Sequence, residues 1–261
     1  MNILPFQPTA RLVGAALLLG AVLNCAAQRK DTDRRPTLSP EESRRQGQAI
    51  IADLLARRPP ENTTNTGVVR IRDAQGKKRE TRVVFSVTVS PTNWVSAYET
   101  RPADHPEKAE RLLVTHHAGG TIDYLLTRPG RAGGAEVSLP LSGAQLMTPF
   151  AGSDFWVADL GLDFLHWPEP QLLRKEMRHS RPAAVVETRS GHPSPGGYSR
   201  VVAWLDTDNG GVLHAEAYDD KGTMIKVFDP TAVKGHELAE MEMSSAVDDS
   251  RTWIHFDVDG K

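Results

Sequence analysis

The stretch that decides the fold is FAGSDFWVADLGLDFLHWP, residues 150–168. It holds two of the five tryptophans and three of the seven phenylalanines of the chain. Ser153 has a hydroxyl that can cap a helix, Asp154 would complement the positive helix end, and Pro168 would stop the helix. The spacing therefore predicts one short aromatic helix that begins at Ser153 and ends at Trp167. Such a helix is either a plug of the core or a lid over an apolar cavity.

The chain before and after this stretch has the two-residue periodicity of β-strands. In 79–89, for example, Val83, Phe85 and Val87 alternate with more polar side chains. Asn and Gly at 208–211 suit a tight hairpin, because these residues tolerate positive φ. We expect strands over 68–72, 79–89, 94–100, 112–115, 121–127, 135–139, 183–188, 198–205, 212–218, 223–229, 237–243 and 252–258. Their regular spacing predicts one large antiparallel sheet.

One longer helix is predicted ahead of the strands, over 40–58. Ser39 is its cap, Pro40 occupies the first helical position, and Pro59 stops it. Its narrow apolar stripe includes Ile50 and Leu54. Such a helix needs an apolar surface to lie on, and the face of a sheet would serve.

Residues 1–27 have the pattern of an export signal. The apolar run 12–23 is too short to span a bilayer, which takes roughly 20 residues, and the small residues after it suit cleavage behind Ala27. Cys25 is the only cysteine and lies where a bacterial lipoprotein carries its lipid, but Asn24 stands before it in place of a small residue. We therefore expect a periplasmic protein or, alternatively, an envelope protein anchored through a lipid on Cys25.

The rest of the chain divides simply. A charged, proline-containing linker is predicted over 28–39, and 40–261 shows no boundary or repeat, so it is predicted to be one domain. The chain has 31 Lys and Arg against 33 Asp and Glu, and this balance gives no electrostatic basis for binding nucleic acid. Membrane contact is expected only through an acylated Cys25. The mature chain has no cysteine for a disulfide, a thiolate metal site or a nucleophile.

No arrangement of catalytic or metal-binding residues emerges. His116 and His117 are adjacent, so on a strand they would point to opposite faces, and the other histidines are isolated. No Walker loop, nucleophile elbow or dinucleotide glycine pattern occurs. Asp154, Asp159 and Asp163 could form an acid pair for hydrolysis, although a helix start and solvent contact explain them better. We expect a protein that is not an enzyme and uses no metal and no cofactor.

Small side chains in one predicted strand bear on the cavity. Leu213, Ala215 and Ala217 alternate within 212–218 and would share a face. Small residues on an inner face leave room that bulkier ones would fill. Alanine on a strand more often only faces a bulky neighbour, so both interpretations stay open.

Two blocks of sequence resemble a known family. The first is 152–155, Gly-Ser-Asp-Phe, followed by Asp-Leu at 159–160. The second is a strand with Trp-x-Asp at its end, 198–206, followed by the hairpin 216–222 and by Lys-Val-Phe at 226–228. Both blocks are similar to motifs of exported outer-membrane lipoprotein-sorting proteins, the LolA-like group.

The resemblance extends over about residues 46–258 and rests on structural motifs. It implies a mainly β (α+β) fold, in which a single large antiparallel sheet curves into an incomplete β-barrel closed by a few helices. It also implies an apolar concavity that holds the acyl chains of lipoproteins or other lipids. The chain departs from the family at Trp156 and 163–167, which are more aromatic, so the identity of the ligand stays open.

The function that follows is a periplasmic carrier or sensor of acylated lipoproteins or lipids. Its lid or cavity wall would include Phe155, Trp156, Leu160, Phe164 and Trp167, each of which could equally be plain core. One alternative is a structural or interaction protein of the cell envelope, whose filled sheet binds an envelope protein through an edge. A hydrolase of an envelope polymer that uses the three aspartates is a more distant alternative.

Overall fold

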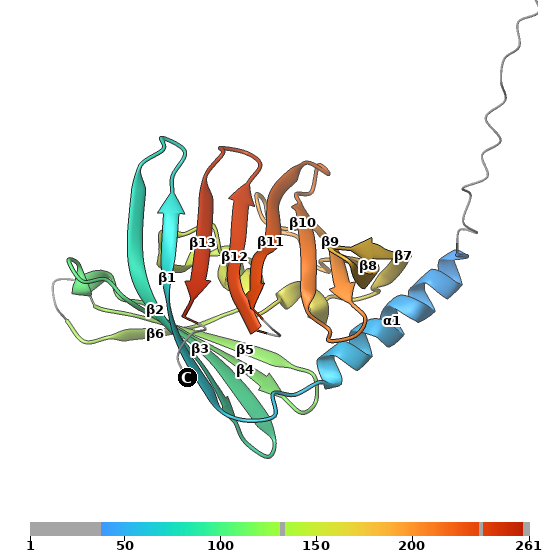
Figure 1. The fold of residues 1–261 in the computed structure, drawn as a ribbon, viewed down its shortest axis with the longest axis horizontal. Helices are drawn as coiled ribbons and strands as arrows, with labels where there is room; N and C mark the ends of the chain where they lie inside the picture. The colour runs from blue at the N-terminus through green and yellow to red at the C-terminus, as the bar shows by residue number, and fades with distance from the viewer. Residues whose placement is uncertain (1–37, 131–133, 235–236, 258–261) are drawn as a thin grey trace, which may run out of the picture. The chain divides into compact units, whose positions relative to one another are not determined.

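A computed structural model describes residues 38–130, 134–234 and 237–257. It contains one long helix, α1 (Pro40–Ala56), and thirteen strands in a single sheet (Figure 1). The strands are β1 (Thr63–Arg72), β2 (Lys78–Val89), β3 (Asn93–Arg101), β4 (Arg111–His117), β5 (Ile122–Arg128), β6 (Val137–Leu141), β7 (Gln171–Arg178), β8 (Arg181–Arg189), β9 (Arg200–Asp206), β10 (Val212–Tyr218), β11 (Met224–Lys234), β12 (Glu237–Ser245) and β13 (Arg251–Phe256). The expected signal peptide with Cys25, and most of the expected linker, lie outside the described residues.

Strands β1 and β13, the first and the last in chain order, pair with each other at the centre of the sheet. The order is β6-β5-β4-β3-β2-β1-β13-β12-β11-β10-β9-β8-β7, and the pairing of β1 with β13 runs from Gly67 opposite Phe256 to Arg72 opposite Arg251. Every strand pair is antiparallel. The prediction of one large antiparallel sheet with few helices is confirmed.

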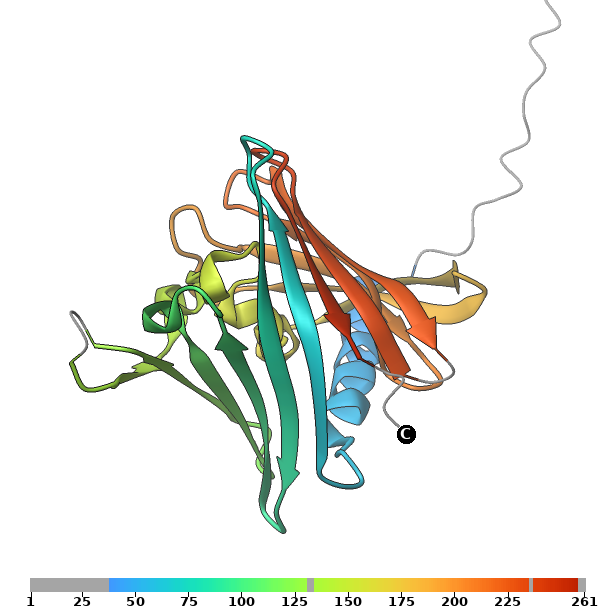
Figure 2. The same cartoon turned by 60° about the vertical axis from the view of Figure 1, so that its left-hand side comes forward.

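The sheet is strongly curved but does not close (Figure 2). Strands β6 and β7 are its two edges. The chain leaves the sheet at β6 and re-enters it at β7, so residues 142–170 must cross from one edge to the other. We call these residues the crossing segment. They include the aromatic stretch, and Figures 1 and 2 show them passing across the inner side of the curve.

Strand β7 was not expected from the sequence. Of its side chains, Leu172 is buried, whereas Leu173 and Met177 are exposed. A register shift between Leu172 and Arg174 interrupts the pairing with β8. A bulge at an edge breaks the apolar alternation by which strands are recognised.

Helix α1 packs against the β7 side of the inner face. Glu42 N–H donates to Ser39 Oγ at 3.2 Å, which confirms the predicted cap. Ile51 is buried in a cluster with Leu172, Val186 and Leu205. Gly47 permits this approach, because a Cβ there would lie 2.4 Å from the carbonyl oxygen of Pro170. The sheet face thus supplies the apolar surface that the helix requires.

The prediction of one continuous helix from Ser153 to Trp167 is wrong. The crossing segment contains four short turns of helix: η3 (Gly143–Met147), η4 (Phe150–Gly152), α2 (Val157–Leu160) and η5 (Asp163–His166). Leu162, in the middle of the predicted helix, has a φ of 51°, which a right-handed helix cannot accommodate. Side chains of the sheet bond the freed backbone groups: Thr252 Oγ1 accepts from Asp154 N–H at 2.9 Å, and the Tyr98 hydroxyl donates to Leu160 O at 3.1 Å. Tertiary partners therefore replace the helical hydrogen bonds.

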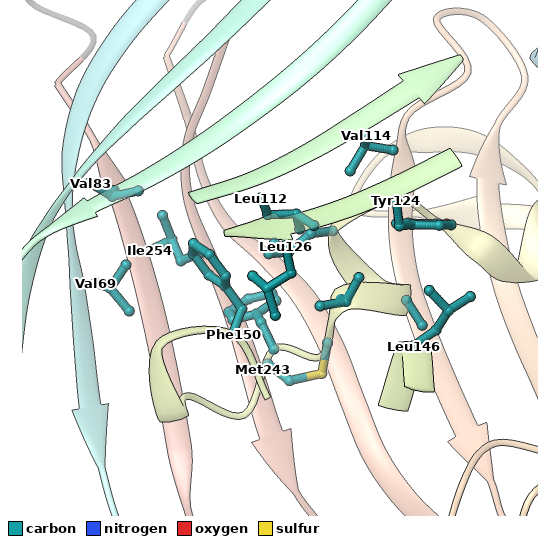
Figure 3. Close-up of a cluster of buried hydrophobic side chains, with 14 of the residues drawn as sticks. Val69, Val83, Leu112, Val114, Tyr124, Leu126, Leu146, Phe150, Met243 and Ile254 are labelled. Atoms are coloured by element: carbon teal, nitrogen blue, oxygen red, sulfur yellow. The ribbon is translucent and has the colours of Figure 1, made fainter. Parts of the chain in front are cut away.

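The core of the first half of the sheet forms around Phe150. This side chain is 1% exposed and lies in a cluster drawn from both halves of the sheet and from the crossing segment. In Figure 3 its ring lies among side chains that include Ile254 of β13, Leu126 of β5 and Met243 of β12. The Phe150 end of the crossing segment thus fills the interior between strands β1–β5 and strands β12 and β13.

We expect Phe150→Ala to lower the free energy of unfolding by about 3–5 kcal/mol, the usual range for truncating a fully buried phenylalanine. Urea denaturation followed by tryptophan fluorescence measures this change. Val247→Ala is the control, since Val247 is 72% exposed and its truncation should change stability by less than about 0.5 kcal/mol. Equal effects of the two substitutions would contradict the proposed arrangement of the core.

Candidate functional site

A cavity of about 500 Å³ lies between the crossing segment and strands β10–β12. We call it the apolar cavity. Its walls are formed by Tyr98, Phe155, Leu160, Leu162, Phe228 and Met241. Its rim includes Val212, Leu213, Pro230, Val233 and Leu238. Val233 and Leu238 are 54% and 37% exposed, so this rim opens to solvent beside the connection of β11 and β12.

Two of the five predicted ligand-facing residues line this cavity. Phe155 and Leu160 do so, and both are buried. Phe164 lines a smaller space of about 30 Å³ beside it. Trp156 stacks on Tyr198 with ring centroids 4.6 Å apart, and Trp167 Nε1–H donates to Asp163 Oδ2 at 2.8 Å. That these five residues contact a ligand stays a prediction.

The small side chains noted in β10 are divided between the two spaces. Ala215 and Ala217 line the 30 Å³ space. Leu213 lies at the rim of the apolar cavity, where a register shift between Val212 and His214 interrupts the strand. Small residues on the inner face do leave room, of the size that one buried water needs.

A buried lysine joins the crossing segment to the sheet at the edge of these spaces. Lys226 of β11 is 6% exposed, and its Nζ donates to Asp154 O at 2.5 Å. The same Nζ lies 3.4 Å from the centroid of the Trp156 ring and 3.8 Å from Asp159 Oδ2. A cation over a tryptophan face that is shielded from water is attracted to it by about 2 kcal/mol. We call Lys226, Asp159, Tyr198 and Trp156 the lysine cluster.

Asp159 receives hydrogen bonds from two other directions. Trp156 N–H donates to Asp159 Oδ2 at 2.7 Å, which caps helix α2, and the Tyr198 hydroxyl donates to Oδ1 at 2.9 Å. The helix therefore begins at Trp156, with Asp159 as the capping side chain, and not at Ser153.

Burial dominates the electrostatics of the lysine cluster. Desolvation lowers the pKa of Lys226 from 10.5 to about 8, although Asp159 and Asp154 oppose this shift. Desolvation also raises the pKa of the Asp159 carboxyl, against the effect of Lys226. Burial thus disfavours the charged form of both Lys226 and Asp159, while the charge of each residue stabilises the charged form of the other. Separating them would leave an isolated charge in an apolar surrounding, which costs several kcal/mol.

The other two aspartates of the aromatic stretch also have defined donors. Asp154 accepts hydrogen bonds from Ser250 Oγ at 2.5 Å and Thr252 Oγ1 at 2.7 Å. Asp163 accepts from the Tyr124 hydroxyl at 3.3 Å, besides the indole of Trp167. These bonds attach the crossing segment to strands β5 and β13.

Lys226 and Phe228 are site residues that the sequence alone did not single out. They are two residues apart on β11, so they share a face, and both face the crossing segment. The sequence does contain an indication of this site, because Lys226 takes a position in the strand whose alternation with Phe228 assigns it to the inner face. Among the described residues, no group of three or more His, Cys, Asp or Glu could hold a metal ion. Within that same part of the chain, no helix has the length and hydropathy to cross a membrane.

Comparison with known proteins identifies the fold. The chain is similar to an outer membrane lipoprotein-sorting protein domain from Vibrio parahaemolyticus (20% identity, TM-score 0.67, covering 82% of this chain and 91% of the other). It is similar to a DUF1329 family protein from Desulfovibrio piger (19% identity, TM-score 0.64, covering 84% of this chain and 95% of the other). It is also similar to a LolA superfamily protein from Nitrosomonas europaea (16% identity, TM-score 0.55, covering 80% of this chain and 90% of the other). The structural neighbours agree with the LolA-like resemblance, and at these identities the likeness is one of fold.

Comparisons of sequence add less. A family model described as an uncharacterized protein matches residues 136–257. A search of curated proteins finds no match.

The lysine cluster predicts a specific pH dependence of stability. The unfolded chain holds the Lys226 proton up to about pH 10.5, whereas the folded protein releases it above about pH 8. Between these values unfolding takes up a proton, so the wild type should gain stability as the pH rises, by about 3 kcal/mol over the full interval. Lys226→Met should remove this gain.

Urea denaturation of both proteins from pH 7 to pH 10 tests the prediction, because the difference between the two curves cancels the titrating groups outside the lysine cluster. Asp159 loses the effect of Lys226 in the variant, so its pKa is raised further, and this lowers the stability of the variant as the pH rises and leaves the sign of the difference unchanged. Because the pKa of Lys226 is lower in the folded than in the unfolded protein, the free energy of unfolding of the wild type must rise with pH relative to that of Lys226→Met. Parallel curves would show that Lys226 is not buried as described.

Proposed function

We propose that this chain, with the fold it shares with LolA superfamily proteins, is a non-catalytic carrier or sensor that holds acyl chains of lipoproteins or other lipids in the apolar cavity. The observation that supports this most directly is the cavity itself. Its volume of about 500 Å³ falls in the range of about 300–1,000 Å³ that is typical of small-molecule sites. Its walls are nearly all aromatic or aliphatic side chains.

The lining of the cavity suits a hydrocarbon chain. Asp159 and Arg181 are the only charged residues among the described lining residues, and Asp159 is bonded within the lysine cluster. A 16-carbon chain could contribute up to about 13 kcal/mol on full burial, at about 0.8 kcal/mol per methylene. The rim of the cavity is open to solvent at Val233 and Leu238, so burial would be incomplete and binding reversible.

The attachment of the crossing segment explains how the cavity could adapt to cargo. Helix α2 contributes both Asp159 and Leu160 to the wall of the cavity, and Asp159 lies 3.8 Å from Lys226 Nζ, so the lysine cluster fixes this wall to β11. A longer chain would need this wall to move. The wall can then move only with the loss of the Lys226 contacts, and this cost would subtract from the binding free energy of a longer chain.

The cellular setting of the proposal rests on the expected signal peptide and on the names of the structural neighbours. One neighbour is described as an outer membrane lipoprotein-sorting protein domain. We place this chain in the periplasm, with an acylated lipoprotein or a lipid as its ligand and an envelope protein as a possible partner in transfer.

Filling the cavity should abolish binding. Val212 lines both the apolar cavity and the smaller space beside it, and Val212→Trp adds an indole to this volume. We expect native mass spectrometry to detect lipid on the wild type and at least tenfold less on Val212→Trp. Val137→Trp on the edge strand β6, where Val137 is 47% exposed, should retain the lipid.

The absence of lipid from natively purified wild type, together with failure to bind an added fluorescent fatty acid, would contradict the proposal. That outcome would favour the structural or interaction protein of the envelope.

A further inference from the structure

A second pocket, of about 260 Å³, borders the same crossing segment. The end of α1, the turn between β2 and β3 and the turn between β4 and β5 meet the crossing segment there. We call it the histidine pocket, because His116, His117 and His166 line it. Leu162 lines this pocket and also the apolar cavity. One side chain therefore borders both spaces.

The charged residues of the histidine pocket are all basic. Arg57 and Arg58 line it, and none of its described lining residues is Asp or Glu. Arg57 is paired with Asp53, at 2.7 Å. Arg58 donates to three backbone carbonyls: from Nη1 to Pro91 O at 3.0 Å, and from Nη2 to Ser90 O at 2.5 Å and to Asn93 O at 3.0 Å. No carboxylate of the described residues pairs with Arg58, so its charge remains available to an anion.

His116 offers a neutral hydrogen-bonding group to the same pocket. Its imidazole stacks on Trp94 with centroids 3.6 Å apart and planes inclined by 7°. Burial, followed by the nearby His166 and His117, lowers the pKa of His116 to about 4. The ring is therefore neutral at pH 7 and carries one N–H. Within the described part of the chain, no hydrogen bond to the ring of His116 is formed.

His166 is also held in a single tautomer. Its Nδ1 lies 3.0 Å from Gly120 O, and a carbonyl only accepts, so Nδ1 carries the proton. Burial lowers the pKa of His166 as well. The positive charge of the pocket thus comes from the arginines. Because the one N–H of His166 is used on Gly120 O, His116 is the ring of these two that can donate a hydrogen bond to an anion.

Leu162 separates the two spaces in a strained conformation. Its φ of 51° is uncommon for any residue other than Gly, Asn or Asp. The preceding Gly161 leaves no room for adjustment, since a Cβ there would lie 2.3 Å from the ring of Tyr124. Strain of this kind persists where the surroundings hold it and is often found at binding sites.

We propose that the histidine pocket holds the anionic head of the ligand whose acyl chain occupies the apolar cavity, with the chain passing Leu162. This inference rests on the proposed function and narrows its ligand to an acyl chain with a carboxylate or phosphate head. Arg58 supplies the charge, and the N–H of His116 supplies a directed hydrogen bond. Charge-assisted hydrogen bonds of this kind are the stronger class.

Three ligands with one chain length separate the effect of the head from that of the chain. Binding of dodecanoate, dodecyl phosphate and dodecanol to the full chain is measured by isothermal titration calorimetry at pH 7. We expect both anions to bind at least tenfold more tightly than the alcohol. The ratio of the two anions then shows whether the pocket favours a carboxylate or a phosphate.

Two substitutions in the pocket test the assignment of residues. Arg58→Gln removes the unpaired charge, and His116→Phe removes the N–H while keeping a ring to stack on Trp94. Each should weaken anion binding at least fivefold and leave dodecanol binding unchanged. Arg101→Gln is the matched control, because Arg101 lies at the other end of β3 from Trp94 and should change neither. Thermal unfolding of each variant establishes that it is folded.

The outcomes separate this inference from the proposed function. If dodecanol binds the wild type as tightly as the anions do, or if Arg58→Gln weakens all three ligands equally, the head-group assignment is overturned and the acyl cavity stands. If none of the three ligands binds, both are overturned.

Discussion

The constraint on which the structure depends is topological. The first strand in the chain, β1, and the last, β13, pair at the centre of the sheet. Strands β1 to β6 therefore run from the centre to one edge, and strands β7 to β13 run from the other edge back to the centre. The chain that leaves the edge at β6 must therefore reach the far edge at β7, and the route across the inner face is the shorter one on a curved sheet. A segment on that route must be apolar enough to be buried and irregular enough to follow the curve. The composition of 150–168 answers both demands.

The sequence predicted most of the fold because its strands are amphipathic and separated by strong turns. It singled out Phe155 and Leu160 as cavity-wall or core residues because the stretch 150–168 is aromatic and apolar. It could not predict that the aromatic stretch breaks into short turns, since helical periodicity does not show that Thr252 and Tyr98 would bond its backbone from the sheet. Lys226 was missed because a lysine in an alternating strand is normally taken to face solvent. These features depend on contacts between residues far apart in the chain.

The two ends of the crossing segment are attached to the sheet by different interactions, apolar packing at Phe150 and the lysine cluster at α2. The Phe150 end of the crossing segment is fixed by close packing, which tolerates little displacement. The α2 end is fixed by a lysine and an aspartate that are both reluctant to be charged in a buried site. A buried ion pair adds little net stability compared with apolar packing, but it defines one arrangement sharply. The pair thus holds the wall of the apolar cavity in one arrangement, while it contributes little to the net stability of the fold.

The central pairing of β1 with β13 also has a kinetic consequence. Gly67 meets Phe256, so the hydrogen bonds that join the two halves form between the beginning and the end of the polypeptide. Each half is a meander of strands that are neighbours in the chain and can assemble locally, whereas the pairing of β1 with β13 must close the loop from Gly67 to Phe256. A nascent chain without its last strand therefore has an exposed edge at β1. We therefore expect the pairing of β1 with β13 to form late in folding, and with it the second wall against which the crossing segment packs.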